Sequence, residues 1–221
     1  MLMGEGGLVL IDGEPGPGLI SVFDGGLLRG DGCFEAIRSY RGRLFAWPEH
    51  LARLHLSAHA LGIRVPDTHR LQSWAEEVAA DGGDCIVRVV LTRGGEIPGR
   101  VTPPRCIVLS HPVSAPGPEL SLASIPAPWH PAGRPWELSG VKTISYAPNQ
   151  AATRRAAAAG CDDALLLSGE GIVLEGPTFS IAWVRAGSVE TPGLDLGILD
   201  SITRRFLIEI CAERGIRLAE G

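Results

Sequence analysis

Hydrophobic residues in the first half of the chain alternate between strand-like and helix-like spacing. Alternating or continuous short apolar runs predict strands, and apolar residues three or four positions apart predict helices. Strands are predicted at 7–11, 34–40, 85–92 and 106–109, and helices at 48–61 and 68–80. Arg41-Gly-Arg43 is typical of a hairpin turn, and Gly62 is placed to end the first helix.

The second half follows the same mixed pattern after a proline-rich interruption. Residues 111–118 hold three prolines and no periodic pattern, which predicts a linker. Strands are predicted at 120–125, 164–167, 172–174 and 181–184, and helices at 149–159 and 201–214. The sequence therefore predicts an α+β fold with two subdomains, residues 1–110 and 119–221, and a site between them.

Composition and charge narrow the class of protein. The 221 residues are 45% hydrophobic, which supports a packed core and argues against disorder. A net charge of −5 argues against a general nucleic-acid binder, because such proteins need a basic surface. No apolar run reaches the roughly 18 residues of a membrane span, and the first residues lack the pattern of a signal peptide. These features predict a cytoplasmic enzyme or binding domain.

Residue spacing disfavours several common functional sites. The five cysteines never form Cys-x-x-Cys, so we expect small buried hydrophobic residues rather than a disulfide scaffold or a zinc site. His50, His55 and His59 share one helical segment, but no glutamate completes a zinc motif there. We therefore expect a partly exposed helix face and no metal. Gly30-Asp-Gly32 precedes a strand, which makes it a weak dinucleotide signal.

Lysine occurs once in the chain, at position 142, among twenty basic residues. A general preference for arginine explains most of this bias, but it does not explain why one lysine is present. A guanidinium stays protonated and cannot act as a nucleophile, whereas an amine can form a Schiff base. Lys142 is therefore a candidate for covalent catalysis, with chance as the alternative.

Several segments resemble, in order along the chain, the signatures of one enzyme family. They are Arg29-Gly-Asp-Gly-Cys-Phe-Glu-Ala-Ile-Arg38, Glu49-His-Leu-Ala-Arg53-Leu54, Ser139-Gly-Val-Lys142-Thr-Ile-Ser-Tyr146-Ala-Pro-Asn149, Gly171-Ile-Val-Leu-Glu175-Gly-Pro-Thr178 and Gly197-Ile-Leu-Asp-Ser-Ile-Thr-Arg204. The chain resembles the class IV, or fold type IV, pyridoxal-phosphate enzymes over nearly its whole length. This family includes branched-chain and D-amino acid aminotransferases, (R)-amine transaminases and aminodeoxychorismate lyases.

The resemblance implies pyridoxal 5'-phosphate as the cofactor and gives roles to residues around its ring. Lys142 is implied to bind the cofactor as a Schiff base and then to move the proton of the substrate Cα. Glu175 corresponds to the carboxylate beside the pyridine nitrogen, with an exposed strand-end carboxylate as the alternative. Tyr146 resembles the tyrosine that hydrogen-bonds the phenolic oxygen of the cofactor.

The resemblance also implies how the cofactor phosphate is held. Arg53 corresponds to the phosphate-binding arginine of the family, and its planar fork suits a phosphate. Ser201, Ile202 and Thr203 begin a helix, and free N–H groups at a helix start bind anions. Ser201 stands where relatives usually have glycine, so plain N-capping is an alternative or additional role.

The sequence leaves the substrate and the reaction open. Phe34, Arg88 and Arg93 are candidate substrate-binding residues, and Arg100 offers another guanidinium. A solvated strand or loop is the alternative for each arginine. The leading expectation is an aminotransferase that acts on an amino donor and a 2-oxo acid.

Two alternatives to the aminotransferase are kept. An aminodeoxychorismate lyase, which releases pyruvate and 4-aminobenzoate, shares the same cofactor chemistry. The other alternative is a catalytically weak family member. Relatives usually continue beyond the position where this chain ends, so the C-terminal subdomain of this chain is expected to be shorter than theirs. The resemblance further implies a homodimer, with neither nucleic acid nor membrane as a partner.

Overall fold

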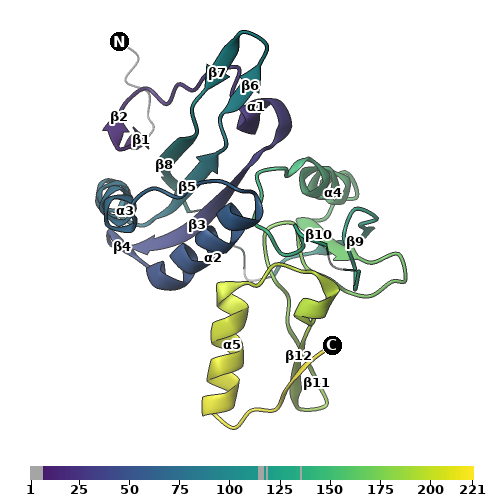
Figure 1. The fold of residues 1–221 in the computed structure, drawn as a ribbon. Coiled ribbons are helices and arrows are strands. Elements are labelled where there is room, and N and C mark those ends of the chain that lie inside the picture. The colour runs from purple at the N-terminus through teal and green to yellow at the C-terminus, as the bar shows by residue number, and fades with distance from the viewer. Residues whose placement is uncertain (1–6, 114–116, 118, 135) are drawn as a thin grey trace. The chain divides into compact units, whose positions relative to one another are not determined.

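The computed structural model describes residues 7–113, 117, 119–134 and 136–221 (Figure 1). The chain folds into two compact units. The first unit comprises residues 1–115 and 141–145, and the second comprises 116–140 and 146–221. Each unit has its own cluster of buried hydrophobic residues, so the chain has two cores rather than one.

A six-stranded antiparallel sheet forms the centre of the first unit (Figure 1). Its strands lie in the order β2 (Glu14–Pro15), β1 (Val9–Ile11), β8 (Arg105–Pro112), β5 (Cys85–Thr92), β3 (Gly32–Tyr40) and β4 (Arg43–Leu44). In the register of β3 and β5, Cys33 lies opposite Leu91 and Ala36 lies opposite Arg88. Because side chains alternate along a strand, the odd-numbered residues of both strands share one face and the even-numbered residues share the other.

The two helices that the sequence predicts in this unit pack on the sheet. α2 (Trp47–Ala60) packs against β3, and α3 (Thr68–Gly82) packs against β5 and β8. The shared core consists mainly of Ile37, Leu54, Ala58, Leu71, Ala75, Val78, Val87, Val89 and Val108. Asp67 caps α3 by accepting the Arg70 N–H at 3.1 Å. The helical spacing of apolar residues therefore predicts both helices correctly.

The first unit also has short elements that the sequence patterns do not predict. These are α1 (Gly25–Arg29) and the hairpin of β6 (Gly95–Ile97) and β7 (Arg100–Thr102). Asp24 caps α1 by accepting the Gly26 N–H at 2.7 Å and the Thr92 hydroxyl at 2.9 Å. Gly30 ends the helix in the left-handed region, with φ of 69°. Elements of three to five residues are too short to give a hydrophobic period.

Residues 141–145 belong to the first unit, which corrects their predicted place in the C-terminal subdomain. They run beside the beginning of β3, where the Phe34 N–H donates to the Lys142 carbonyl and the Ile144 N–H donates to the Gly32 carbonyl, both at 3.0 Å. Cys33 and Thr143 form an antiparallel bridge. β4 pairs with the other end of β3, so the edge at Gly32–Phe34 accepts this segment instead.

The second unit contains a parallel pair of strands and an alanine-rich helix. β9 (Leu122–Pro126) pairs with β10 (Asp163–Leu167), and α4 (Ala147–Ala158) packs against both. Ala152 and Ala156 lie four residues apart on α4 and are fully buried. Their small side chains let the helix lie close to the strands that it connects.

The rest of the second unit is a small sheet followed by a helix. The sheet has the order β11 (Trp183–Arg185), β12 (Ser188–Thr191) and β13 (Leu218–Glu220). The 3-10 helix η1 (Leu194–Leu196) and the helix α5 (Ile202–Glu213) lie between β12 and β13 in sequence. The patterns predict α5 but neither β12 nor β13, because strands this short contain too few residues to show a clear alternation of apolar and polar side chains. Residues 172–174, predicted as a strand, make one bridge, from Val173 to Leu167.

The predicted linker coincides only partly with an irregular segment. His111 and Pro112 complete β8, while Val113 and Gly117 have no regular structure. Residues 114–116 and 118 lie outside the described residues. Prolines near the end of β8 explain the misplaced boundary, because a proline is tolerated at the end of a strand.

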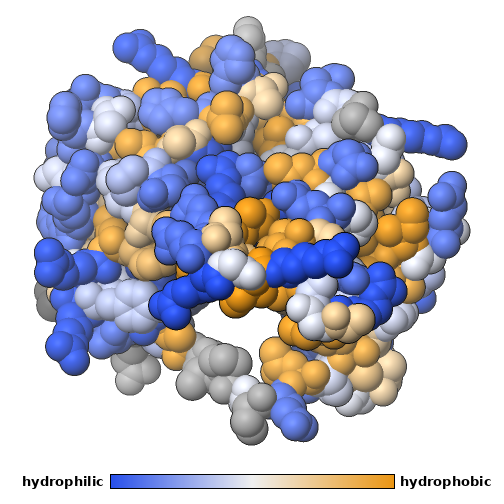
Figure 2. All heavy atoms as spheres, turned by 90° about the horizontal axis from the view of Figure 1, so that it is seen from below, coloured by the Kyte–Doolittle hydropathy of each residue, from blue (hydrophilic) through white to orange (hydrophobic). Residues whose placement is uncertain are grey.

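Hydrophobic side chains also reach the surface. On the face drawn in Figure 2, hydrophobic residues appear in several places among hydrophilic ones. Leu19, Val22 and Val101 of the first unit are strongly exposed. None of the helices in the described part of the chain combines the length and the apolar character that crossing a bilayer requires.

Candidate active site

Lys142 is held through its backbone beside β3. Its carbonyl accepts the Phe34 N–H at 3.0 Å, and its own N–H donates to the Ser57 hydroxyl of α2 at 3.2 Å. The residue is only 9% exposed. The single lysine of the chain is therefore fixed at both its N–H and its carbonyl and is largely shielded from solvent.

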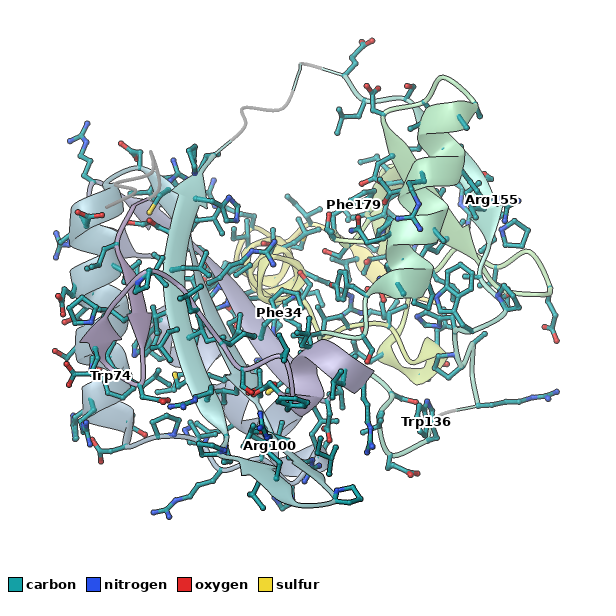
Figure 3. The ribbon with its side chains drawn as sticks, turned by 90° about the horizontal axis from the view of Figure 1, so that it is seen from above. Phe34, Trp74, Arg100, Trp136, Arg155 and Phe179 are labelled. Atoms are coloured by element: carbon teal, nitrogen blue, oxygen red, sulfur yellow. The ribbon has the colours of Figure 1, made fainter. Side chains whose placement is uncertain are left out.

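The Phe34 ring lies beside both Lys142 and Arg88, on the face of the sheet that carries the even-numbered residues. Phe34, labelled in Figure 3, lies on β3, and Lys142 Nζ is 4.6 Å from the centroid of its ring. Arg88 Cζ lies 5.3 Å from the same centroid, within the range of a cation–π contact. Arg88 Nε also donates to His111 Nε2 at 3.2 Å. Two of the predicted substrate-binding residues, Phe34 and Arg88, therefore lie on the face where Lys142 lies.

Glu35 and Arg53 form a two-pronged ion pair between β3 and α2. Arg53 Nε donates to Glu35 Oε1 at 2.8 Å, and Arg53 Nη2 donates to Oε2 at 2.7 Å. His50 Nδ1 lies 2.7 Å from the same Oε2. All three residues are buried, so the prediction of a partly exposed helix face is wrong for His50, whereas His55 and His59 are exposed.

The charge of Glu35 is set by these neighbours. Burial alone would raise the pKa of Glu35, but the hydrogen bonds from Arg53 and His50, together with their positive charge, bring the pKa below its usual value of 4.5. The ionised carboxylate in turn fixes the plane of the Arg53 guanidinium, because a two-pronged pair allows one orientation. The arginine predicted to hold the cofactor phosphate is thus oriented by an acidic residue.

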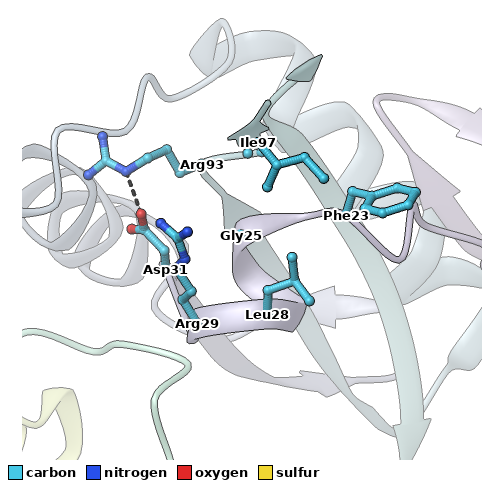
Figure 4. A pocket seen from close by; sticks show the side chains of 9 residues that line it. Phe23, Gly25, Leu28, Arg29, Asp31, Arg93 and Ile97 are labelled. Carbon is cyan, nitrogen blue, oxygen red and sulfur yellow. Dashed lines mark hydrogen bonds and ion pairs between the residues drawn. The ribbon is translucent and has the colours of Figure 1, made fainter. Parts of the chain in front are cut away.

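Arg93 lies at a pocket elsewhere in the first unit. Its Nε donates to Asp31 Oδ2 at 2.7 Å, as Figure 4 shows, and its guanidinium also donates to the carbonyls of Leu61 and Gly62. The pocket has a volume of about 220 Å³ and is lined by Phe23, Gly25, Leu28, Arg29, Asp31, Arg93, Gly94, Gly95 and Ile97. The contacts of Arg93 are those of a side chain that ties the α2–α3 loop to the end of β5. Arg100 lies instead over the Phe23 ring, with Cζ 4.2 Å from its centroid.

Glu175 is held from two sides in the second unit. The Leu199 N–H donates to Oε2 at 3.2 Å, and His130 Nε2 lies 3.4 Å from Oε1. The Glu175 side chain is 17% exposed. The alternative of an exposed strand-end carboxylate is therefore wrong, because the side chain is largely enclosed and has two partners.

Ser201 caps the beginning of α5. Its Oγ accepts the Arg204 N–H at 3.3 Å and the Ser180 hydroxyl at 3.1 Å. The N-capping role considered for Ser201 is confirmed. Ile202 and Thr203 follow as the first helical residues, and N–H groups at these positions have no acceptor within an α-helix. Together with the helix dipole, they offer a site for an anion.

Tyr146 directly precedes α4 and is partly buried. Three residues further along, Asn149 Nδ2 donates to the Pro177 carbonyl at 3.0 Å. This bond ties the beginning of α4 to the segment that follows Glu175. The second unit thus brings the Tyr146 and Glu175 segments together.

Glu35, Ser57 and His130 contact the predicted site residues but are not singled out by the sequence patterns. Glu35 gives a detectable signal, because it is a charged residue at an odd-numbered position of β3, between Cys33 and Ile37, where the core lies. Ser57 and His130 give no comparable signal. Within the described residues, no group of three or more His, Cys, Asp and Glu side chains is placed to hold a metal ion.

Comparison with known proteins gives a consistent family. Residues 32–221 match the family model of class IV aminotransferases. The chain is 34% identical over 208 residues to a putative branched-chain-amino-acid aminotransferase of Methanocaldococcus jannaschii, covering 91% of this chain and 72% of that protein. It is 31% identical over 234 residues to a bifunctional aminodeoxychorismate lyase and D-amino acid transaminase of Mycobacterium tuberculosis, covering 94% of this chain and 79% of that protein.

A solved structure agrees with these matches. A fold IV transaminase from Curtobacterium pusillum matches with a TM-score of 0.82 and 30% sequence identity, covering 94% of this chain and 76% of that chain. The family match begins at the first residue of β3 and includes Lys142, Glu175 and α5. The chain therefore belongs to the class IV aminotransferase family and has the fold of the fold type IV transaminases.

Proposed function

We propose that this chain is a pyridoxal-phosphate-dependent aminotransferase that transfers an amino group between an amino acid or amine and a 2-oxo acid. The observation that carries the proposal is the environment of Lys142. The only lysine of the chain is largely buried, is fixed at its N–H and carbonyl, and has its amine beside the Phe34 ring. Class IV aminotransferases depend on pyridoxal phosphate, and a buried amine is the group that such a cofactor needs from the protein.

The residues that the family resemblance marks are suited to bind this cofactor. When bound, pyridoxal phosphate supplies an aldehyde that reacts with amines and a ring that accepts electrons from the substrate Cα. We assign the phosphate to Arg53, whose guanidinium Glu35 orients, and to the N–H groups of Ile202 and Thr203 beside Ser201. We assign the phenolic oxygen to the Tyr146 hydroxyl.

The chain's own groups then account for the proton transfers. The Lys142 amine, when not bonded to the cofactor, would take the proton from the substrate Cα and pass it to the cofactor carbon that bears the aldehyde. The same amine would carry the proton in the opposite direction during the second half of the reaction, with the 2-oxo acid. Leu199 and His130 keep the two oxygens of the Glu175 carboxylate in place. The negative charge of this carboxylate would hold a proton on the pyridine nitrogen. The low exposure of Lys142 limits access of water to the amine.

We assign the substrate carboxylate to Arg88. Arg88 shares the sheet face of Lys142 and lies beside Phe34, which would contact the substrate side chain. Arg93 keeps the structural role that its bonds to Asp31, Leu61 and Gly62 indicate. An Arg88→Met variant should raise KM for a carboxylate-bearing donor far more than for a simple amine.

Two measurements test the proposed function. The purified protein, once incubated with pyridoxal phosphate, should show a visible absorption band. Addition of D-alanine, L-leucine or an (R)-amine should bleach this band. Borohydride should then attach one pyridoxyl group, and peptide mapping should find it on Lys142. Because Lys142 is the only lysine, a label found solely on the N-terminal amine would refute the proposal.

An aminodeoxychorismate lyase is the second candidate, favoured by the similarity to the bifunctional enzyme of Mycobacterium tuberculosis. Lys142 and Glu175 serve both reactions, so they do not separate the two. Pyruvate formed from aminodeoxychorismate without any added 2-oxo acid would select the lyase. Amino transfer that requires a 2-oxo acid acceptor would select the aminotransferase.

We infer that the enzyme is a homodimer. Leu19, Val22, Leu27 and Leu28 are exposed by half or more within ten residues of sequence. Clusters of exposed apolar side chains mark protein interfaces. Light scattering at micromolar concentration should give twice the chain mass of 23.3 kDa, and Leu28→Glu should reduce it. A monomer mass for the unchanged protein would contradict this inference.

A further inference from the structure

We propose that His130 is a positioning residue, which holds the Glu175 carboxylate in the orientation needed to keep a proton on the pyridine nitrogen of the cofactor. This inference rests on the proposed function, in which Glu175 holds the proton on the pyridine nitrogen. His130 Nε2 lies 3.4 Å from Glu175 Oε1, and the His130 side chain is only 9% exposed. None of the family signatures identified in the sequence includes His130.

The hydrogen bonds of His130 define which ring nitrogen carries the proton. The Ala132 N–H donates to His130 Nδ1 at 3.4 Å, so Nδ1 is an acceptor and carries no hydrogen in the neutral ring. The hydrogen therefore lies on Nε2, which faces the carboxylate. In this tautomer His130 donates to Glu175, and the ring is oriented from both of its nitrogens.

The loop that carries His130 is firmly anchored within the second unit. The Ala127 N–H donates to the Leu167 carbonyl at 2.8 Å, and the His130 N–H donates to the Ala127 carbonyl at 2.9 Å. Gly197 has φ of 78°, and a Cβ added there would lie 2.5 Å from Pro131 Cγ. The loop therefore packs tightly against the turn that leads to Leu199, whose N–H binds the other oxygen of Glu175.

The two donors leave Glu175 with capacity for a further bond. Each carboxylate oxygen can accept about two hydrogen bonds. Oε1 accepts a hydrogen bond from His130, and Oε2 accepts one from Leu199. Removing the His130 donor would leave the carboxylate free to rotate about its remaining bond. The expected result is a misdirected carboxylate, not an unfolded protein.

The test compares His130→Phe, His130→Gln and the control His59→Phe, which changes an exposed histidine of α2. Phenylalanine keeps an aromatic ring but removes the donor, whereas the glutamine amide keeps an N–H near the position of Nε2. We expect His130→Phe to lower kcat about 10-fold or more, with KM and the thermal midpoint little changed. His130→Gln should restore most of the rate, and His59→Phe should behave as the unchanged protein. Equal rates for His130→Phe and the unchanged protein would overturn the proposal.

A second measurement uses the apoprotein, so it does not depend on the cofactor. Long-range ¹H–¹⁵N spectra of histidine-labelled protein should show His130 as the Nε2–H tautomer, identified by its absence in His130→Gln. Its Nε2–H signal should shift in Glu175→Leu, while the other histidine signals stay in place. An Nδ1–H tautomer, or a signal indifferent to Glu175→Leu, would overturn the proposal. If the protein took up no pyridoxal phosphate, the proposed function would fail, but these spectra would still decide whether His130 holds Glu175.

Discussion

Glu35 and Arg53 share two hydrogen bonds, of 2.8 and 2.7 Å, in the interior of the first unit. One partner lies on β3 and the other on α2, so the pair ties the helix to the strand that also carries Phe34. Because both side chains are buried, each charge depends on the other for compensation. The pair therefore links the stability of the first unit to the orientation of the arginine assigned to the cofactor phosphate.

Replacing Glu35 by glutamine should destabilise the protein markedly. The amide leaves the buried Arg53 charge without a counter-charge, and breaking a buried ion pair in this way costs about 3–5 kcal/mol. Urea unfolding at pH 7 should report this loss. Asp84→Asn, which weakens the partly exposed ion pair with Arg38, is the control and should cost less than about 1 kcal/mol. Equal effects of the two changes would contradict the role assigned to Glu35.

The stability difference between Glu35→Gln and the unchanged protein should depend on pH. The pKa of Glu35 is lower in the folded protein than its usual value of 4.5, so the folded state holds the ionised form more firmly. This contribution is present above pH 4.5 and is lost as the pH falls through the folded-state pKa. The difference in unfolding free energy should therefore shrink as the solution becomes more acidic than pH 4.5. A difference that grows on acidification would show that the sign of the shift is wrong.

Long elements with a clear period are the part of the fold that the sequence predicts well. The continuous β-rich run at 85–92 gives β5 with the same bounds, and Ser201 marks the start of α5 because its side chain caps the helix. Residues 141–145 are assigned to the wrong unit, because their structure depends on the free edge of β3. No pattern within that segment predicts pairing with a strand so distant in sequence.

The candidate site, like the fold, is only partly predictable from the sequence. Lys142 is a candidate by residue type alone, since an amine is chemically distinct from nineteen guanidinium groups. Its surroundings are not predictable, because Ser57 is 85 residues away in sequence and contributes one hydroxyl from the buried side of α2. His130 is hidden for the same reason, since its role appears only when its loop folds against the turn before Leu199.

Lys142→Arg separates the charge of Lys142 from its nucleophilic chemistry. Arginine keeps a cation beside Phe34, so the fold and thermal midpoint should change little. A guanidinium cannot form the covalent bond or take the Cα proton, so turnover should fall by several orders of magnitude. Borohydride treatment should attach no pyridoxyl group to the chain interior. Turnover within about tenfold of the unchanged enzyme would remove Lys142 from the mechanism.

The five cysteines should differ sharply in reactivity. Burial raises the pKa of Cys33 and of Cys106 to about 12, with Glu35 adding to the first effect and Asp12 to the second. Cys161 is the one cysteine that is not buried. Iodoacetamide at pH 8 should therefore label Cys161 first in the native protein, because alkylation requires a thiolate. Peptide mapping checks this result, and Cys161→Ser should remove the fast phase; rapid labelling of Cys33 would contradict the structure.

Substitutions at Ser201 test its capping role separately from any contact with phosphate. Ser201→Ala removes the acceptor for the Arg204 N–H and should cost about 1 kcal/mol, whereas Ser201→Gly should cost only a few tenths. Urea unfolding of the apoprotein measures both. Both variants lack the hydroxyl, so a loss of phosphate affinity common to both would reveal a direct contact. Equal destabilisation by alanine and glycine would mean that capping is not the main contribution of this side chain.

Replacing Glu175 by glutamine should slow the chemical step while leaving the cofactor in place. The amide has nearly the same shape, but its one oxygen can accept from only one of the two donors, Leu199 N–H and His130 Nε2–H, and it lacks the charge that holds a proton on the pyridine nitrogen. A charge-assisted hydrogen bond is worth about 1.5–3 kcal/mol, so removal of the substrate Cα proton should slow by roughly 10- to 150-fold. Single-turnover rates with the best amino donor measure this step, and the absorption band of the bound cofactor measures occupancy. Occupancy should change far less, since the Lys142 linkage, Arg53 and the start of α5 are untouched. An unchanged rate in Glu175→Gln would mean that this carboxylate, although enclosed and held from two sides, takes no part in the reaction.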